Sequence, residues 1–173
     1  MSNGGTDTPT KYPVLDADFL PKMLGSCKDE EERGLIRILD MTGMHVSSLC
    51  SLTSSSLIVR GDRRYLTWIR PKTNKTLECL IPKDFLVETQ GFLAHKRHSR
   101  QHYLRLVSEI GKRAGYEGIS PMTFRHNRCI RSIKQHEGNP FVVAQDMGCS
   151  VDVVFRNYSK LREDQLQNDE RDS

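Results

Sequence analysis

The chain lacks the features that would mark a secreted or membrane-spanning protein. Its 173 residues contain no apolar run near the roughly 18 to 20 residues that a spanning helix needs. Its five cysteines are odd in number, irregularly spaced and without a CxxC pair, which disfavours a disulfide framework, a zinc site and a redox motif. We therefore expect a cytoplasmic protein with reduced thiols and no membrane partner.

Acidic residues are scarce between Gly91 and Lys134. This stretch holds ten Lys or Arg against Glu109 and Glu117, although the whole chain has a net charge of only +4. Clustered basic charge suits a polyanion, because each neutralised phosphate releases counterions. On charge alone, a solvated helical face is an equally good explanation.

The chain also lacks internal repeats and low-complexity tracts, and its length suits one domain with a sizeable core. Residues 1–12 are small, polar and aperiodic, so we expect a flexible leader, then one domain over 13–160 and a polar acidic tail over 161–173. Apolar spacing predicts helices over 30–49 (with a break at Thr42-Gly43), 84–90, 99–114, 123–136, 140–147 and 150–158. Runs at 56–59, 65–70 and 77–81 predict an antiparallel sheet of two or three strands. The predicted fold class is mainly α (α+β).

Two short motifs lie in the first half of this domain. Thr42-Gly43-Met44-His45 ends an apolar helix, and Ser48 follows three residues after His45. Further on, Lys72 and Lys75 lie in a predicted hairpin turn that precedes Ile81-Pro82.

Two more motifs follow in the basic half. The first reads Ser120-Pro121-Met122-Thr123-Phe124-Arg125-His126 and opens a predicted helix. The second reads Asp146-Met147-Gly148-Cys149-Ser150, and Tyr158 follows ten residues after Gly148.

Taken in order, the four motifs resemble those of the catalytic domain of the tyrosine recombinase (phage integrase) family, over roughly Pro13 to Lys160. The resemblance implies a helical catalytic domain with a small antiparallel sheet, without the separate N-terminal DNA-clamping domain of full members. It implies site-specific recombination or integration of double-stranded DNA through a phosphotyrosine intermediate, with no metal and no small-molecule cofactor. It also implies a nucleoid-associated protein or one encoded by a virus or mobile element.

The resemblance assigns three chemical roles. Tyr158 is the nucleophile, Arg125 clamps the phosphate, and Lys72 is the general acid, with Lys75 as the alternate. It also implies a DNA-binding face that contains Lys75, Arg97, Arg100, His126 and Arg128.

Three further catalytic positions of the family are substituted. His45 replaces an arginine, Met122 a basic residue or histidine, and Cys149 a histidine or tryptophan; Ser48 replaces an acid. Histidine has a reference pKa of about 6.5 and one donor at a time near neutrality, so it cannot copy a guanidinium. Since each lost preorganised donor costs roughly 10² to 10³ in rate, we predict that catalysis is lost or weak while the fold and DNA affinity persist.

Several alternatives stay open at this stage. Another arginine, Arg128 or Arg131 or one from a neighbouring protomer, could sustain activity. A different class is a non-catalytic DNA-binding or regulatory module derived from a recombinase, acting alone or with an active recombinase, and a third is a protein-interaction domain without DNA affinity. Self-assembly is expected on DNA only, since the tail has few apolar residues beyond Leu161 and Leu166.

Three histidines have a spacing that suits a metal site. His95, His98 and His102 would share one helical face if the helix began early enough. The interleaved Lys96, Arg97 and Arg100 repel a cation, so we expect a DNA-facing or solvated surface and no metal.

Overall fold

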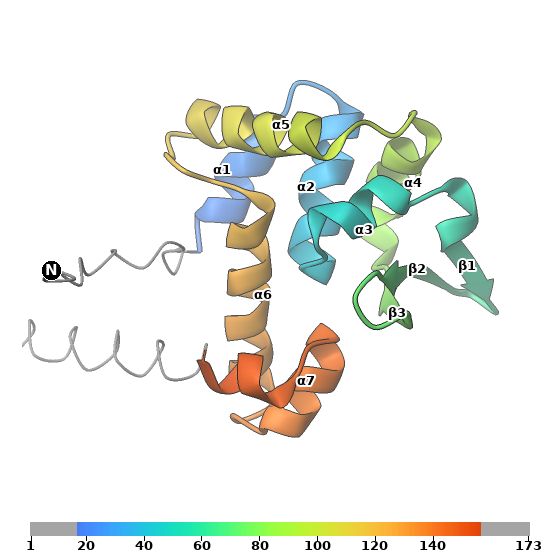
Figure 1. The fold of residues 1–173 in the computed structure, drawn as a ribbon. Coiled ribbons are helices and arrows are strands. Elements are labelled where there is room, and N and C mark those ends of the chain that lie inside the picture. Colours follow the sequence, from blue (N-terminus) through green and yellow to red (C-terminus); the bar gives the residue numbers. More distant parts are fainter. Residues whose placement is uncertain (1–16, 157–173) are drawn as a thin grey trace, which may run out of the picture.

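The computed structural model describes residues 17–156, which form a mainly helical domain with one small sheet (Figure 1). The first half contains α1 (Phe19–Gly25), α2 (Glu30–Thr42), α3 (Val46–Ser51), β1 (Leu57–Arg60), β2 (Arg63–Arg70) and β3 (Lys75–Leu80). The second half contains α4 (Leu86–Ala94), α5 (Arg100–Arg113), α6 (Pro121–Gln135), α7 (Pro140–Met147) and a last helical stretch over 151–156. Two short 3-10 turns, Ser54–Ser56 and Lys83–Phe85, lead into β1 and α4.

Helix α2 is the centre of the domain. It begins at Asp29, whose carboxylate accepts a hydrogen bond from the Glu32 amide at 2.8 Å, and it ends at Gly43, whose φ of 59° is the left-handed conformation that glycine adopts most readily. Its side chains Leu35, Ile36, Ile38 and Leu39 are fully buried and pack in the main core with those of α1, α4 and α5. Figure 1 shows α5 across the ends of α1 and α2, with α7 at the far end of α6.

Helices α2 and α4 approach each other closely at Gly34. A Cβ at this position would lie 2.3 Å from the Glu88 carbonyl oxygen and 2.6 Å from Phe92 Cβ, so only glycine fits. Beside this contact, Glu88 accepts hydrogen bonds from Arg33 at 3.2 Å and Arg37 at 2.7 Å. The two arginines therefore hold α4 against α2 by ion pairs.

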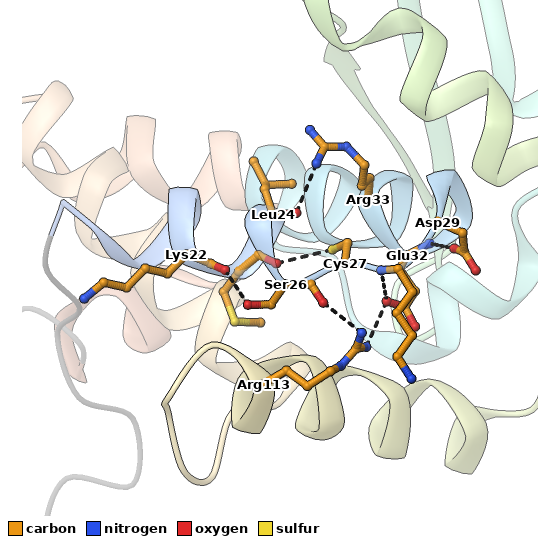
Figure 2. Close-up of polar contacts among 10 residues, drawn as sticks. Lys22, Leu24, Ser26, Cys27, Asp29, Glu32, Arg33 and Arg113 are labelled. Atoms are coloured by element: carbon orange, nitrogen blue, oxygen red, sulfur yellow. Dashed lines mark hydrogen bonds and ion pairs between the residues drawn. The ribbon is translucent and has the colours of Figure 1, made fainter.

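The loop between α1 and α2 is held against α5 by Arg113 (Figure 2). Its guanidinium donates to the Ser26 carbonyl and to a Glu32 carboxylate oxygen, both at 2.8 Å, and that same oxygen accepts from the Lys28 amide. In this loop burial, with a smaller effect of Glu32, raises the pKa of the Cys27 thiol to about 11, and the thiol donates to the Met23 carbonyl. Cys27 is therefore a protonated packing residue near neutral pH.

The sheet is antiparallel in the order β1-β2-β3. On β2, Leu66 is buried and Trp68 packs against the core, whereas Ile69 on the opposite face is 55% exposed. Side chains alternate along a strand, so Arg70 continues the row of Leu66 and Trp68. Arg70 pairs with Lys75 across the hairpin, and residues 71–74 form the turn.

Helices α6 and α7 enclose a second, smaller core. Its members come from α6, α7 and the last helical stretch: Cys129, Ile130, Ile133, Val143, Ala144, Met147 and Val154. Helix α6 begins at Pro121, two residues before the predicted start, because Ser120 and Thr123 form a capping box and proline suits the first helical position.

The predicted fold class is confirmed, with three strands and the helices in the predicted order. Helix α1 was missed, since Pro21 interrupts its apolar pattern although proline is tolerated in a first turn. The helix predicted over 84–90 instead runs to Ala94 and includes Gly91. Residues 1–12, 161–173 and Tyr158 lie outside the described part of the chain, so the leader, the tail and the nucleophile stay predictions.

Candidate phosphate-binding site

Four segments that are distant in sequence meet beside the first turns of α6. They are the α2–α3 link with His45, the end of β2 with its turn, the body of α6 with Arg125, and the loop after α7 with Cys149. Two hydrogen bonds join them in pairs: Arg125 Nη1 donates to the Gly43 carbonyl at 2.8 Å, and Arg70 Nη1 donates to the Gly148 carbonyl. The two pairs lie near each other, because the charges of Arg70 and Arg125 both act on His45 and on Cys149. The motifs predicted to form one site, apart from Tyr158, are therefore brought together.

Arg125 is positioned by the buried first turns of α6. Its neighbour Phe124 is fully buried, and the left-handed Gly43 presents its carbonyl to the guanidinium. A Cβ at Gly43 would lie 3.3 Å from Arg125 Cα and 3.1 Å from Arg128 Cβ, so the link needs glycine for its φ and for its space. Burial lowers the pKa of the Arg125 guanidinium, which nevertheless stays charged near neutral pH.

His45 is the N-cap residue of α3. Burial, reinforced by the charges of Arg125, Arg70, Lys72 and Arg100, lowers the pKa of its imidazole from 6.5 to about 4. All four charged groups are cations. His45 is therefore neutral near pH 7, in agreement with the sequence-based expectation, and it marks the centre of a positive region.

The lowered pKa of His45 predicts a loss of stability in acid. Between pH 6.5 and about 4 the unfolded chain binds a proton at this histidine and the folded chain does not, so the free energy of unfolding falls as the pH falls through this range. We expect urea titrations at pH 7 and pH 4.5 to show a larger loss for the wild type than for His45→Gln. In an NMR titration the imidazole should change charge near pH 4. An ordinary midpoint near 6.5 would contradict the positive environment.

Lys72 lies in the exposed β2–β3 turn, and its charge acts on His45. Lys75 is the first residue of β3, is paired with Arg70 in the ladder, and is not among the groups that shift the pKa of His45. The general-acid role of Lys72 and the alternate role of Lys75 stay predictions.

The other substituted positions contribute little charge to the site. Met122, in the first turn of α6, is 39% exposed and carries no donor. Burial raises the pKa of the Cys149 thiol, against the opposing effects of Arg125 and Arg70, so the thiol is protonated near neutral pH. Ser48 is buried in α3, with its hydroxyl 3.5 Å from the Ile69 carbonyl oxygen.

The two arginines that could have taken the catalytic role of an arginine at position 45 make contacts elsewhere. Arg128 donates to the Met41 carbonyl at 3.0 Å and pairs with Asp146 at 3.1 Å. Arg131 donates to the carboxylate and carbonyl of Asp40, at 2.8 and 2.6 Å. These contacts join α6 to α2 and α7, so neither guanidinium is directed to the site. The DNA-contact role of Arg128 stays a prediction.

The remaining predicted DNA-binding residues differ in their surroundings. Arg100, exposed at the start of α5, is close enough to act on the pKa of His45. Arg97 instead donates to the Phe92 and His95 carbonyls and lies 4.0 Å above the Phe92 ring. His126 is half-buried beside Arg125 on α6. A DNA contact of these residues also stays a prediction.

The three histidines do not share a helical face. Helix α5 begins only at Arg100, so His95 caps α4, His98 lies in the connecting segment, and only His102 is helical. The His98 and His102 rings stack with their centroids 4.0 Å apart. Within residues 17–156, no group of three or more His, Cys, Asp or Glu is arranged to hold a metal ion.

Arg70 is the site residue that the motifs did not reveal. The motifs point only to the lysines of the turn, but strand alternation indicates Arg70 as well, because Arg70 continues the inward row of Leu66 and Trp68. A cation at the end of such a row is directed toward the protein. Its contact with Gly148, 78 positions away, could not be read from the sequence.

Comparison with solved structures places this arrangement in a known fold. The XerA recombinase superposes with a TM-score of 0.71 at 21% identity, over 93% of this chain and 67% of that one. The Tn1549 transposon integrase in complex with a circular intermediate DNA gives 0.69 at 18% identity, over 93% and 67%. The catalytic domain of bacteriophage HP1 integrase gives 0.63 at 18% identity, over 86% and 88%.

The chain therefore has the fold of a tyrosine recombinase catalytic domain. It spans between about half and two thirds of several of the solved recombinase and integrase chains that it matches. No family model and no curated protein matches the sequence. No helix within residues 17–156 is long and apolar enough to cross a membrane.

Proposed function

We propose that this chain is a DNA-binding domain of the tyrosine recombinase and integrase type, whose catalytic step is lost or weak. The observation that carries the proposal is that Arg125 and Lys72 both lie near His45, and Arg125 also near Cys149, so that the two substituted positions stand in a positive environment. A DNA phosphate is the natural ligand for buried and half-buried cations of this kind. The solved structures of this fold include an integrase in complex with DNA, which supports the same partner.

The chemical step that this site would perform is transfer of a phosphodiester to Tyr158. The tyrosine oxygen would form a bond to phosphorus and give up its proton to water, while the bond from phosphorus to the 5′-oxygen breaks. Lys72 would donate a proton to that oxygen, and Arg125 would stabilise the charge on the non-bridging oxygens. The reverse attack by a 5′-hydroxyl on the phosphotyrosine would rejoin the strand.

Three features support a weakened step. His45 is neutral near pH 7, Met122 has no donor, and the Cys149 thiol is at best a weak donor. Each missing donor typically costs about 10² to 10³ in rate, although coupled losses are not additive. DNA binding tolerates these losses better than the chemical step does, because much of DNA affinity comes from charge distributed over several phosphate contacts.

A nicked suicide substrate tests the chemical step. We expect duplex DNA to be bound and a covalent protein–DNA adduct to be absent or barely detectable on denaturing gels, with no adduct at all for Tyr158→Phe. Tyr65→Phe on β2 is the matched control and should behave as the wild type. A rapidly formed, abundant adduct that depends on Tyr158 would contradict weakened catalysis, and the absence of DNA binding would contradict the proposed function.

A second candidate is a non-catalytic module that occupies recombination sites or acts with an active recombinase. The neutral His45 at an arginine position favours it, since a pocket can keep phosphate affinity after it loses the ability to stabilise a transition state. For both candidates we propose assembly on DNA and a nucleoid-associated or mobile-element origin. The suicide-substrate assay distinguishes them, because the non-catalytic module gives no covalent adduct under any condition.

A further inference from the structure

Arg70 is fixed at the end of β2 by its own backbone and by its guanidinium. Its carbonyl accepts hydrogen bonds from the amides of Thr73 and Asn74, at 3.3 and 2.9 Å, which closes the β2–β3 turn. Its Nη1 donates to the carbonyl of Gly148 in the loop after α7. The side chain is therefore held between the hairpin and the loop that carries Cys149.

One donor of Arg70 has no acceptor in the described part of the protein. Its Nε is buried and has no hydrogen-bond partner among residues 17–156. A buried donor without a partner carries a desolvation cost, and a ligand acceptor at this place would remove it.

The pairing of Arg70 and Arg125 differs from that of six other arginines in the fold. These six pair with carboxylates inside the domain: Arg33, Arg37, Arg60, Arg113, Arg128 and Arg131. Within the described residues, neither Arg70 nor Arg125 has an ion pair with a carboxylate; each donates to a glycine carbonyl instead. Their charge is thus left for an anion from outside the chain.

Arg70 and Arg125 lie close enough together to act on the same groups. The charge of Arg70 acts on Arg125 and on Cys149, and both arginines act on His45. Two neighbouring cations repel each other, and this repulsion lowers the stability of the folded domain unless an anion lies between them. Both arginines lie near His45, the position that corresponds by resemblance to an arginine of the family.

We propose that Arg70 and Arg125 together bind one DNA phosphate, with Arg70 replacing the guanidinium that is absent at His45. The inference rests on the proposed function, because it names the phosphate group of that ligand and the second side chain that holds it. Two guanidinium groups present parallel pairs of donors to the two non-bridging oxygens of a phosphodiester. Gly43 and Gly148 hold the two groups in place, since their carbonyls accept one hydrogen bond from each.

The first test measures the affinity of the full chain for inorganic phosphate, from the rise in melting temperature at constant ionic strength. We expect Arg70→Gln, which keeps a donor for Gly148 but loses the charge, to bind phosphate about tenfold to a hundredfold more weakly. Arg63→Gln at the other end of β2 is the matched control and should bind as the wild type does. Equal affinities of the two variants would overturn the proposal.

A rescue separates a phosphate contact from a merely structural role. In the Arg70→Gln background, His45→Arg returns a guanidinium to the family position and should recover most of the phosphate affinity. Arg70→Lys keeps the charge without the planar fork and should fall between wild type and Arg70→Gln. Failure of His45→Arg to restore any binding in a variant whose circular dichroism is unchanged would contradict the replacement.

Gel shifts with duplex DNA distinguish this inference from the proposed function. Phosphate binding that depends on Arg70, in a protein that does not bind DNA, would uphold the phosphate pocket and overturn the DNA-binding role. DNA binding that Arg70→Gln and Arg63→Gln weaken equally would leave the DNA-binding role intact and overturn the role of Arg70. Selective weakening by Arg70→Gln in both assays supports both.

Discussion

Gly34→Ala is expected to lower the free energy of unfolding by about 2 to 3 kcal/mol, as overpacking of a close contact does. The new methyl would lie 2.3 Å from the Glu88 carbonyl oxygen and 2.6 Å from Phe92 Cβ. Neither neighbour is the far end of a flexible side chain, so α4 itself must move away from α2. Urea or thermal unfolding of the purified chain measures the loss.

Gly25→Ala is the matched control for this substitution. Gly25 is the last residue of α1, and nothing lies within 4 Å of a Cβ built there. Alanine should leave the stability unchanged or raise it by a few tenths of a kcal/mol, because it restricts the unfolded chain. Equal effects of the two substitutions would mean that α2 and α4 are not packed as closely as the structure places them.

Arg125→Gln is expected to weaken the binding of duplex DNA by about tenfold to a hundredfold and to reduce the slope of affinity against salt by about one. The change removes the charge that lies beside His45 and keeps an amide donor for the Gly43 carbonyl. Fluorescence anisotropy at several salt concentrations gives both quantities. The same substitution should raise the pKa of His45, because one of the cations that lower it is gone.

Lys134→Gln on the same helix is the matched control for Arg125→Gln. Lys134 is an exposed cation in the last turn of α6, far along the helix from Arg125. Its loss should change DNA affinity no more than about twofold at moderate salt, as for a surface charge outside the binding site. If both substitutions weakened binding equally, DNA would be held by the overall positive charge of the chain and not by the pocket.

Much of the fold could be predicted from local patterns. The break at Thr42-Gly43 and the hairpin around residues 71–74 each depend on turn or capping chemistry within a few residues, and the start of α6 was predicted to within two residues. Helix α5 runs from Arg100 to Arg113, close to the predicted 99–114; Ser99 caps it, so His95 and His98 lie outside the helix. Spacing predicts neighbours on a helix only when the helix boundary is known.

The site was predicted in part, since order and spacing of the motifs identified Arg125, Lys72, His45 and Cys149 as one group. The two arginines considered as substitutes, Arg128 and Arg131, are tied to Asp146 and Asp40. Arg128 and Asp146 are 18 positions apart and Arg131 and Asp40 are 91 apart, so no local sequence pattern predicts these ion pairs. The same limit explains why Arg70 was overlooked.

The sequence by itself determined the order of the helices and strands after α1, the glycine turns and the presence of a histidine at position 45, because each depends on residue type or on neighbours within a turn or two. The tertiary structure decided which cations lie beside His45 and which are paired with carboxylates elsewhere. Whether an arginine is neutralised by a carboxylate or left for a phosphate depends on what lies beside its guanidinium, and long-range packing brings Gly43 to Arg125 and Gly148 to Arg70. A charge is available for binding only where folding has left it without a counter-ion.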